Sequence, residues 1–238
     1  MGKWKALAAV ALAACAQVVS AQSFTMKHIG DGYRQAVAIH GLENGSYWAG
    51  QFTMQFVGTA PDGYNQIFTA YCVDLLHILQ SSEVVTLQST NGLNPKGLSP
   101  STGPKVAYLF NTYGPGIADN AHAAALQVAI WETLYDGGDP SGLVKGSSSS
   151  GGNVWFDNTD STVLGYAQSY LQSLGSNTGE ATWLQCVEHP NGANQDLITV
   201  LPDHGRVGGS VPEPGPIASL IGLCVGLSAL GVRGRRRR

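Results

Sequence analysis

Residues Asn120–Tyr135, with the sequence NAHAAALQVAIWETLY, carry a strong helical pattern around which the rest of the domain can be organised. The positions that share one face at helical spacing are Ala123, Gln127, Ile130, Trp131 and Leu134. Gln127 therefore lies in the middle of an otherwise apolar stripe. Burying an amide without a partner costs about 1–3 kcal/mol, so Gln127 needs either a hydrogen-bond partner, such as the backbone, or a covalent bond. Glu132 turns away from this stripe, and we expect it to be solvated.

Capping signals place the ends of this helix. Asp119 or Asn120 is suited to the N-cap, and Gly137-Gly138 followed by Pro140 ends the helix. Apolar residues at helical spacing predict two further helices. They are expected at Lys105–Tyr113 and near Val163–Leu174.

Short alternating runs, broken by Gly, Asn, Asp and Pro, predict strands on both sides of the helices. The expected strands are Tyr33–His40, Tyr47–Val57, Ile67–Ile78, Glu83–Gln88, Thr182–Val187 and Gln195–Val200, with a hairpin turn at Glu43–Ser46. The sequence therefore predicts the α+β class. We expect one strand-rich, β-sandwich-like domain with a helical insertion that carries Gln127.

The charge composition excludes several classes of protein. Only 12% of the 238 residues are charged, which rules out a coiled coil and a charge-rich disordered tail. Between Gln22 and Ser210 there are 6 basic and 15 acidic residues, a formal net charge of -9. An acidic domain of this kind is a poor partner for nucleic acid or anionic lipid.

The first 21 residues have the pattern of a secretory signal peptide. Lys3 and Lys5 precede an apolar run, and Val19-Ser20-Ala21 forms a small-residue cleavage site before Gln22. A second interpretation is lipoprotein processing, with Cys15 lipidated. Either route predicts export of the domain over residues 22–202.

The last residues form a predicted linker, 203–210, and a predicted sorting segment, 211–238. Pro212-Glu213-Pro214 precedes an apolar stretch, Pro216–Val232, which is just long enough for a transmembrane helix, and then a cluster of arginines. This order resembles the PEP-CTERM sorting signal of Gram-negative bacteria. The resemblance implies transient anchoring in the inner membrane, removal of the tail by an exosortase, and delivery to the outer surface or extracellular matrix.

Of the four cysteines, Cys15 falls in the signal and Cys224 in the tail, so Cys72 and Cys186 remain in the domain. A pair of cysteines in an exported domain ordinarily predicts one disulfide. The disulfide would leave the amide of Gln127 on its apolar face without an explanation. Any covalent use of Cys72 other than this disulfide would leave Cys186 as a free thiol in an oxidising compartment.

Two segments together resemble the bacterial thioester domain, a family of surface proteins that form a Cys-Gln thioester. They are Tyr71-Cys72-Val73-Asp74-Leu75 and Leu126-Gln127-Val128-Ala129-Ile130-Trp131-Glu132. The resemblance covers about Tyr71–Tyr135 and implies an internal thioester between the Cys72 sulfur and the Gln127 carbonyl, formed with loss of ammonia. It implies a single-use covalent adhesin, not an enzyme, that needs no cofactor and captures a nucleophile such as a lysine amine on a surface or matrix partner.

The residue types near these motifs suit that chemistry. A thiolate that attacks a carboxamide needs proximity, stabilisation of the oxyanion and a proton for the departing ammonia. Asp74, on the same face of an extended strand as Cys72, and the histidines His77 and His122 are candidate proton shuttles or positioning groups. The candidates for packing that keeps water from the thioester are Tyr71, Ile130 and Trp131.

Other readings remain open from the sequence. A non-covalent surface or matrix-binding module with a Cys72–Cys186 disulfide is the main one. Acidic loops at Asp136–Asp139 and Asp157–Asp160 offer oxygen ligands but lack EF-hand spacing, and the histidines show no metal-site spacing, so no metal site is expected. No motif of a hydrolase or a nucleotide-binding protein is present.

Overall fold

The computed structural model describes residues 22–93, 102–145, 152–187 and 194–201. In these ranges the chain forms a large antiparallel sheet and three helices, so the predicted α+β class is confirmed. The strands are β1 (Ser23–Gly41), β2 (Gly45–Phe56), β3 (Ile67–Cys72), β4 (Ser82–Ser89), β5 (Val154–Trp155), β6 (Thr182–Cys186) and β7 (Leu197–Thr199). The helices are α1 (Thr102–Tyr113), α2 (Asn120–Asp136) and α3 (Ser161–Leu174), with short 3-10 turns η1 (Thr90–Gly92) and η3 (Gly114–Gly116).

The strands close into a ring of antiparallel ladders. Their order is β2-β3-β7-β6-β4-β1-β5, and β1 also pairs with β2. Residues Ser23–Lys27 of β1 pair with β4, Met26–Ile39 pair with β2, and the register shifts twice between His28 and Arg34. Bulges of this kind bend a strand, so the long β1 can join both edges of the sheet. The closed ring differs from the sandwich-like arrangement that the sequence predicts.

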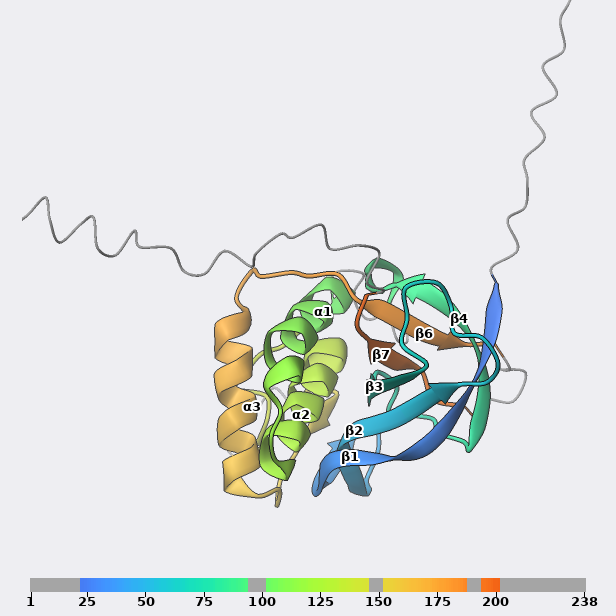
Figure 1. The fold of residues 1–238 in the computed structure, drawn as a ribbon. Helices are drawn as coiled ribbons and strands as arrows, with labels where there is room; N and C mark the ends of the chain where they lie inside the picture. The colour runs from blue at the N-terminus through green and yellow to red at the C-terminus, as the bar shows by residue number, and fades with distance from the viewer. Residues whose placement is uncertain (1–21, 94–101, 146–151, 188–193, 202–238) are drawn as a thin grey trace, which may run out of the picture. The chain divides into compact units, whose positions relative to one another are not determined.

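The three helices lie together on one side of the strands (Figure 1). In the chain they come between β4 and β6, and these two strands are paired neighbours in the sheet. α2 contacts β1 and β2 as well as α1 and α3. α2 therefore lies between the strand ring and the other two helices.

α2 begins and ends where its capping residues predict. The Asp119 side chain caps the N-terminus by accepting from the His122 N–H, and Gly137 ends the helix with a left-handed φ of 80°. Every residue from Ala123 to Tyr135 is buried, because strands cover one side of the helix and helices the other. The prediction that Glu132 is solvated is therefore wrong, and its side chain is 0% exposed.

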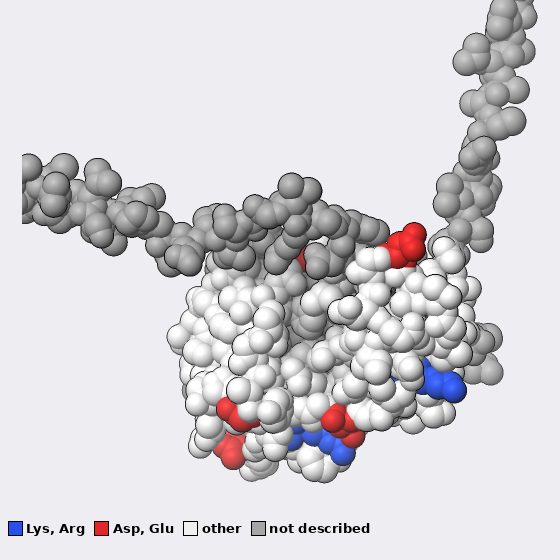
Figure 2. Space-filling view, in the orientation of Figure 1, with Lys and Arg blue, Asp and Glu red and all other residues white. Residues whose placement is uncertain are grey.

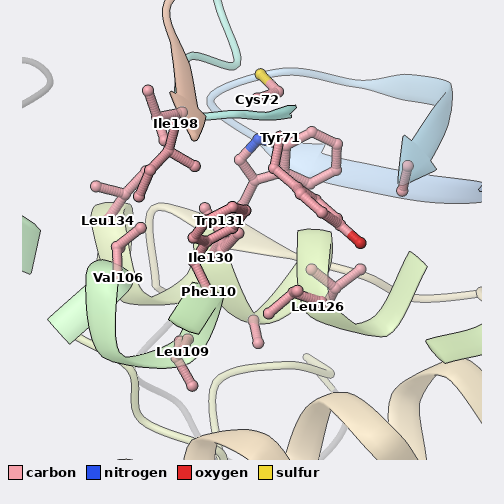
Figure 3. Packing of buried hydrophobic residues seen from close by; sticks show 14 of the residues in the cluster. Tyr71, Cys72, Val106, Leu109, Phe110, Leu126, Ile130, Trp131, Leu134 and Ile198 are labelled. Atoms are coloured by element: carbon pink, nitrogen blue, oxygen red, sulfur yellow. The ribbon is translucent and has the colours of Figure 1, made fainter. Parts of the chain in front are cut away.

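One apolar core joins the strands to the helices (Figure 3). Tyr71 of β3 packs edge-on against Phe110 of α1, with ring centroids 5.9 Å apart. Buried side chains around these rings include Val106, Leu109, Leu126, Ile130, Leu134 and Ile198. Because this packing holds β3 against the helices, it fixes the end of β3 relative to the middle of α2.

β3 ends at Cys72, earlier than the predicted strand Ile67–Ile78. Asp74 Oδ1 accepts from the Leu76 N–H at 2.9 Å, a local turn that competes with strand pairing. The Leu75 N–H donates instead to the hydroxyl of Tyr135 on α2, at 3.0 Å. Asp74 thus lies in a loop, and the prediction that it shares a strand face with Cys72 is wrong.

The predicted signal (1–21), linker (203–210), sorting motif Pro212-Glu213-Pro214 and apolar stretch Pro216–Val232 lie outside the described residues. In the part of the chain that the structure describes, none of the helices has the length and apolar character needed to cross a membrane. The transmembrane prediction for the tail is therefore not tested by the structure.

Glu132 is an ionisable group inside the helical layer. Neither of its carboxyl oxygens has a hydrogen-bond partner among the described residues. Burial, together with the negative charges of Asp136 and Asp139, raises the pKa of Glu132 to about 8. The folded state thus retains a proton that the unfolded state releases above about pH 4.5. The free energy of unfolding falls by up to about 1.4 kcal/mol per pH unit as the pH rises through this window.

We expect Glu132→Gln to remove most of this pH dependence. The neutral amide has no charge to desolvate, so the variant should be more stable than the native chain by about 1–3 kcal/mol at pH 8 and should differ little at pH 4.5. Urea unfolding at the two pH values measures the difference. Glu180→Gln, at an exposed position, is the control and should change stability little at either pH. An effect of Glu132→Gln that is the same at both pH values would contradict the expectation.

Candidate functional site

Cys72 and Gln127, which are 55 positions apart in the chain, are in direct contact. The Cys72 N–H donates to Gln127 Oε1 at 2.9 Å, and Gln127 Nε2 donates to the Cys72 carbonyl at 2.7 Å. Each residue is 1% exposed. The last residue of β3 and the middle of α2 are thereby held together, with the side-chain amide of one against the backbone of the other.

The Cys72 sulfur lies in a tight backbone turn. Sγ donates to the Asp74 carbonyl at 2.8 Å, and the Asp74 N–H lies 3.3 Å from Sγ. Burial raises the pKa of the Cys72 thiol far above its usual range, while the hydrogen bond with the Asp74 backbone and the nearby Trp131 indole act to lower that pKa. The sulfur is therefore a protonated thiol at neutral pH. It needs a neighbouring base before it can act as a nucleophile.

A histidine and a carboxylate form a pair in the loop that follows Cys72. His77 Nδ1 contacts Asp74 Oδ2, and the two side chains are partly buried. A carboxylate that contacts Nδ1 holds the ring in one orientation. The structure thus brings two of the candidate residues, Asp74 and His77, together in the loop that follows Cys72.

Gln195 is a site residue that the sequence did not single out. Its Nε2 donates to the Asp74 carbonyl at 2.9 Å and to the His77 carbonyl at 2.8 Å. Sequence reasoning placed Gln195 at the start of a predicted strand, where a polar side chain has no special meaning. The pairing of β7 with β3 brings Gln195 beside the loop after β3.

A pocket of about 380 Å³ opens beside Cys72. Residues of β1, β2 and their turn form one wall, residues Leu75–Leu79 form another, and Cys72, Trp131 and Gln195 complete the lining. His77 belongs to the second wall. The pocket therefore gives a small molecule or a side chain a route to the neighbourhood of the buried sulfur.

Charged side chains are sparse on the face of the domain seen in Figure 2. In the pocket wall Arg34 is paired with Asp31 and lies over the exposed Trp48 ring, 4.6 Å from the ring centroid. Glu43 accepts from the Tyr47 hydroxyl at 3.3 Å and forms no ion pair within the described residues. The wall thus has one carboxylate without a cation, which favours a positively charged ligand.

The remaining predicted site residues separate into two groups. Tyr71 and Ile130 are in the core, and Trp131, 3% exposed, lies between core and pocket with its ring parallel to that of Phe156. His122 is elsewhere, in the first turn of α2, where it contacts Asp119 at 2.7 Å and stacks on Tyr166. His122 is not among the residues that line the pocket, so the structure does not bring it to Cys72.

Neither Cys72 nor Cys186 is in a disulfide. The two lie on β3 and β6, which are separated in the sheet by β7. Two strand spacings amount to about 10 Å, which exceeds the Cα separation of about 4.4–6.8 Å that a disulfide requires. Cys186 Sγ instead lies 3.6 Å from Glu83 Oε2. The arrangement of strands therefore does not fit the alternative Cys72–Cys186 bridge.

The acidic loops considered as metal ligands have structural partners. Asp136 accepts from the backbone N–H groups of Asn153 and Val154, and Asp160 caps α3 at Thr162. Asp139 and Asp157 likewise accept backbone N–H groups, at Ser141 and Lys145. Within the described ranges no group of three acidic, histidine or cysteine side chains is placed to hold a metal ion.

Gln195 should control the order of the loop that carries Asp74 and His77. We expect Gln195→Ala to lower the free energy of unfolding by about 1 kcal/mol, because two partly buried carbonyl groups lose their shared donor. The same change should speed hydrogen exchange of the amides in residues 74–79, measured by mass spectrometry. Gln185→Ala, on β6, is the matched control. Unchanged exchange in residues 74–79 would refute this role for Gln195.

Comparison with known proteins gives no information on the function of this site. Comparison of the chain with protein-family models, with curated proteins and with solved structures finds no significant match. A function for the pocket therefore has to be inferred from its residues and their contacts, and from the two motifs at Tyr71–Leu75 and Leu126–Glu132.

Proposed function

We propose that the domain forms an internal thioester between Cys72 Sγ and Gln127 Cδ and uses it once, to bind a partner covalently. The observation that carries the proposal is the pair of hydrogen bonds, 2.9 and 2.7 Å, that hold the Gln127 amide against the Cys72 backbone. Because these bonds fix the amide on the backbone of the residue that carries the sulfur, they reduce the entropic cost of bringing Sγ and Cδ together. Support also comes from the two sequence motifs and from the helical segment between β4 and β6 that carries Gln127.

Formation of the thioester needs a base and a leaving group. His77, held by Asp74, takes the thiol proton, and the sulfur attacks Gln127 Cδ. The Cys72 N–H already donates to Gln127 Oε1, so it can stabilise the negative charge that develops on this oxygen. The bond from Cδ to Nε2 then breaks, and the nitrogen leaves as ammonia with the proton from His77.

Capture of the partner consumes the thioester. An amine on the partner attacks Gln127 Cδ, the bond from Cδ to sulfur breaks, and the amine proton passes through His77 to the sulfur. The products are an amide bond to the partner and a free Cys72 thiol. Because the site is used up, the protein is a covalent adhesin and not an enzyme, and the reaction needs no cofactor.

The surroundings of the site favour an amine carried by a lysine. Glu43 in the pocket wall attracts an ammonium group, and the net negative charge of the domain acts in the same direction over longer distances. Tyr71, Ile130 and Trp131 keep bulk water away from the acyl group, which would otherwise hydrolyse.

The localisation of the protein is part of the same proposal. The signal at residues 1–21 directs export, and the segment at residues 211–238 with Pro212-Glu213-Pro214 anchors the chain in the inner membrane until an exosortase removes it. The adhesin then acts at the outer surface or in the extracellular matrix. Its partner is a surface or matrix nucleophile, not a nucleic acid.

A second candidate function is a non-covalent surface or matrix-binding module. One observation favours it: the Gln127 amide has both of its polar ends bonded to the backbone, so its burial is explained without a covalent bond. The two functions differ in the mass of the protein. They also differ in reactivity toward small amines.

The test of the proposed function is the intact mass of the chain, followed by peptide mapping. We expect a deficit of one ammonia that maps to the peptides containing Cys72 and Gln127, and addition of one methylamine at Gln127 on incubation with this amine. Cys72→Ala and Gln127→Ala should abolish both, whereas Cys186→Ala should not. A full mass and no response to methylamine would rule out the thioester.

His77 should set the rate of the covalent step. We expect His77→Gln to slow the reaction of the thioester with methylamine by about 100-fold, because a positioned general base contributes a factor of this order. Stopped samples analysed by mass spectrometry give the rate. His122→Gln is the matched control, since it changes a histidine that does not line the pocket. Equal rates in the two variants would exclude His77 as the shuttle.

A further inference from the structure

Trp131 carries a buried hydrogen-bond donor that no described residue satisfies. Its Nε1 is inaccessible to solvent and has no hydrogen-bond partner within the part of the chain that the structure describes. An unsatisfied buried N–H costs about 1–3 kcal/mol, and such groups are rare in folded proteins. Packing alone does not explain it, because a phenylalanine fills an apolar site without this cost.

The position of this donor points to the reactive sulfur. Trp131 follows Gln127 by four residues on α2, so the two side chains project from the same face of the helix. The indole nitrogen is on the side of the ring that faces β3 and Cys72 (Figure 3). Trp131 and Cys72 line the same pocket, and the indole is one of the groups that lower the pKa of the Cys72 thiol against the effect of burial.

The orientation of the indole is fixed by its neighbours. Its ring lies nearly parallel to that of Phe156, with an interplanar angle of 8° and 6.5 Å between centroids. The other donors at the site are already in use: the Cys72 N–H bonds Gln127 Oε1, and the Asp74 N–H lies against Sγ. Among these donors, Trp131 Nε1–H is therefore the one that is available to the sulfur.

We propose that Trp131 Nε1–H donates a hydrogen bond to the Cys72 sulfur when the sulfur carries negative charge, which makes Trp131 a catalytic residue of the proposed thioester site. The proposal rests on the proposed function for its biological meaning. Negative charge appears on sulfur twice: in the thiolate that attacks Gln127 Cδ, and in the thiolate that leaves when a partner's amine displaces it. In both steps the indole keeps its proton, because it only donates a hydrogen bond.

A donor to the charged sulfur also explains how a thiol in an enclosed position can react. Burial alone strongly disfavours the thiolate, so both formation of the thioester and its aminolysis would be slow. A hydrogen bond to a charged acceptor is stronger than one to a neutral acceptor. The indole therefore contributes most when the sulfur is charged, which is the condition for lowering a barrier.

The first experiment measures the sulfur without the thioester. In the full chain with Gln127→Ala, the Cys72 thiol is alkylated with iodoacetamide at several pH values, and the peptide that contains Cys72 is quantified by mass spectrometry. We expect Trp131→Phe, added to this background, to lower the alkylation rate at each pH about tenfold. Loosened packing would instead expose the thiol and raise the rate, so the sign distinguishes the two roles. An unchanged or faster rate would overturn the proposal.

The matched control is Trp155→Phe, which removes an indole that does not line the pocket and should leave alkylation of Cys72 unchanged. If Trp131→Phe fails to fold, Trp131 is replaced by 3-benzothienylalanine, which keeps the size of the ring and removes only the N–H. This variant should show the same fall in the alkylation rate. With Gln127 present, loss of the N–H should slow reaction of the thioester with methylamine about 10- to 100-fold. If no thioester forms in the native chain, the proposed function fails, whereas the alkylation rates still decide whether Trp131 acts on the sulfur.

Discussion

The pair of hydrogen bonds between the Gln127 amide and the Cys72 backbone is the contact on which the rest of this site depends. It joins the strand ring to the helical layer at a point where both residues are buried. A buried amide needs all of its hydrogen bonds, because a missing bond there costs more free energy than a formed bond contributes to stability. The closed ring, the core around Tyr71 and the caps of α2 all have to position these two segments correctly. The fold and the site are therefore set by one geometric condition.

The sequence predicted the elements that have a simple periodic pattern. The caps at Asp119 and Gly137 and the apolar positions of α2 are local properties, so they could be read without a structure. The first part of β1 was missed, because Ser23–Gly32 contains Lys, His, Gly and Asp in place of a run of apolar residues. This part of the strand forms because it pairs with β4 on one side and β2 on the other. Pairing with distant strands cannot be recognised from a short stretch of sequence.

The errors at single residues have a common physical cause. Glu132 was expected to be solvated because a helix at a surface has one polar face, but α2 is covered on both sides. The strand after Ile67 was expected to continue through Asp74, but the Asp74 side chain bonds the Leu76 N–H and turns the chain. Gln195 had no pattern of its own, and its importance comes only from the two carbonyl groups that the fold brings to it. Each error concerns what a residue meets in three dimensions.

The thioester site that we propose has to reconcile a buried sulfur with an accessible acyl group. Full burial protects a thioester from water but disfavours the thiolate in both steps of the chemistry. Full exposure would favour the thiolate but would lose the acyl group to hydrolysis. The structure combines a closed core on one side of Cys72 with a pocket on the other, and it places His77 and Trp131 in the pocket lining. A base and a hydrogen-bond donor at the sulfur can replace the solvation that burial removes, so protection and reactivity need not exclude each other.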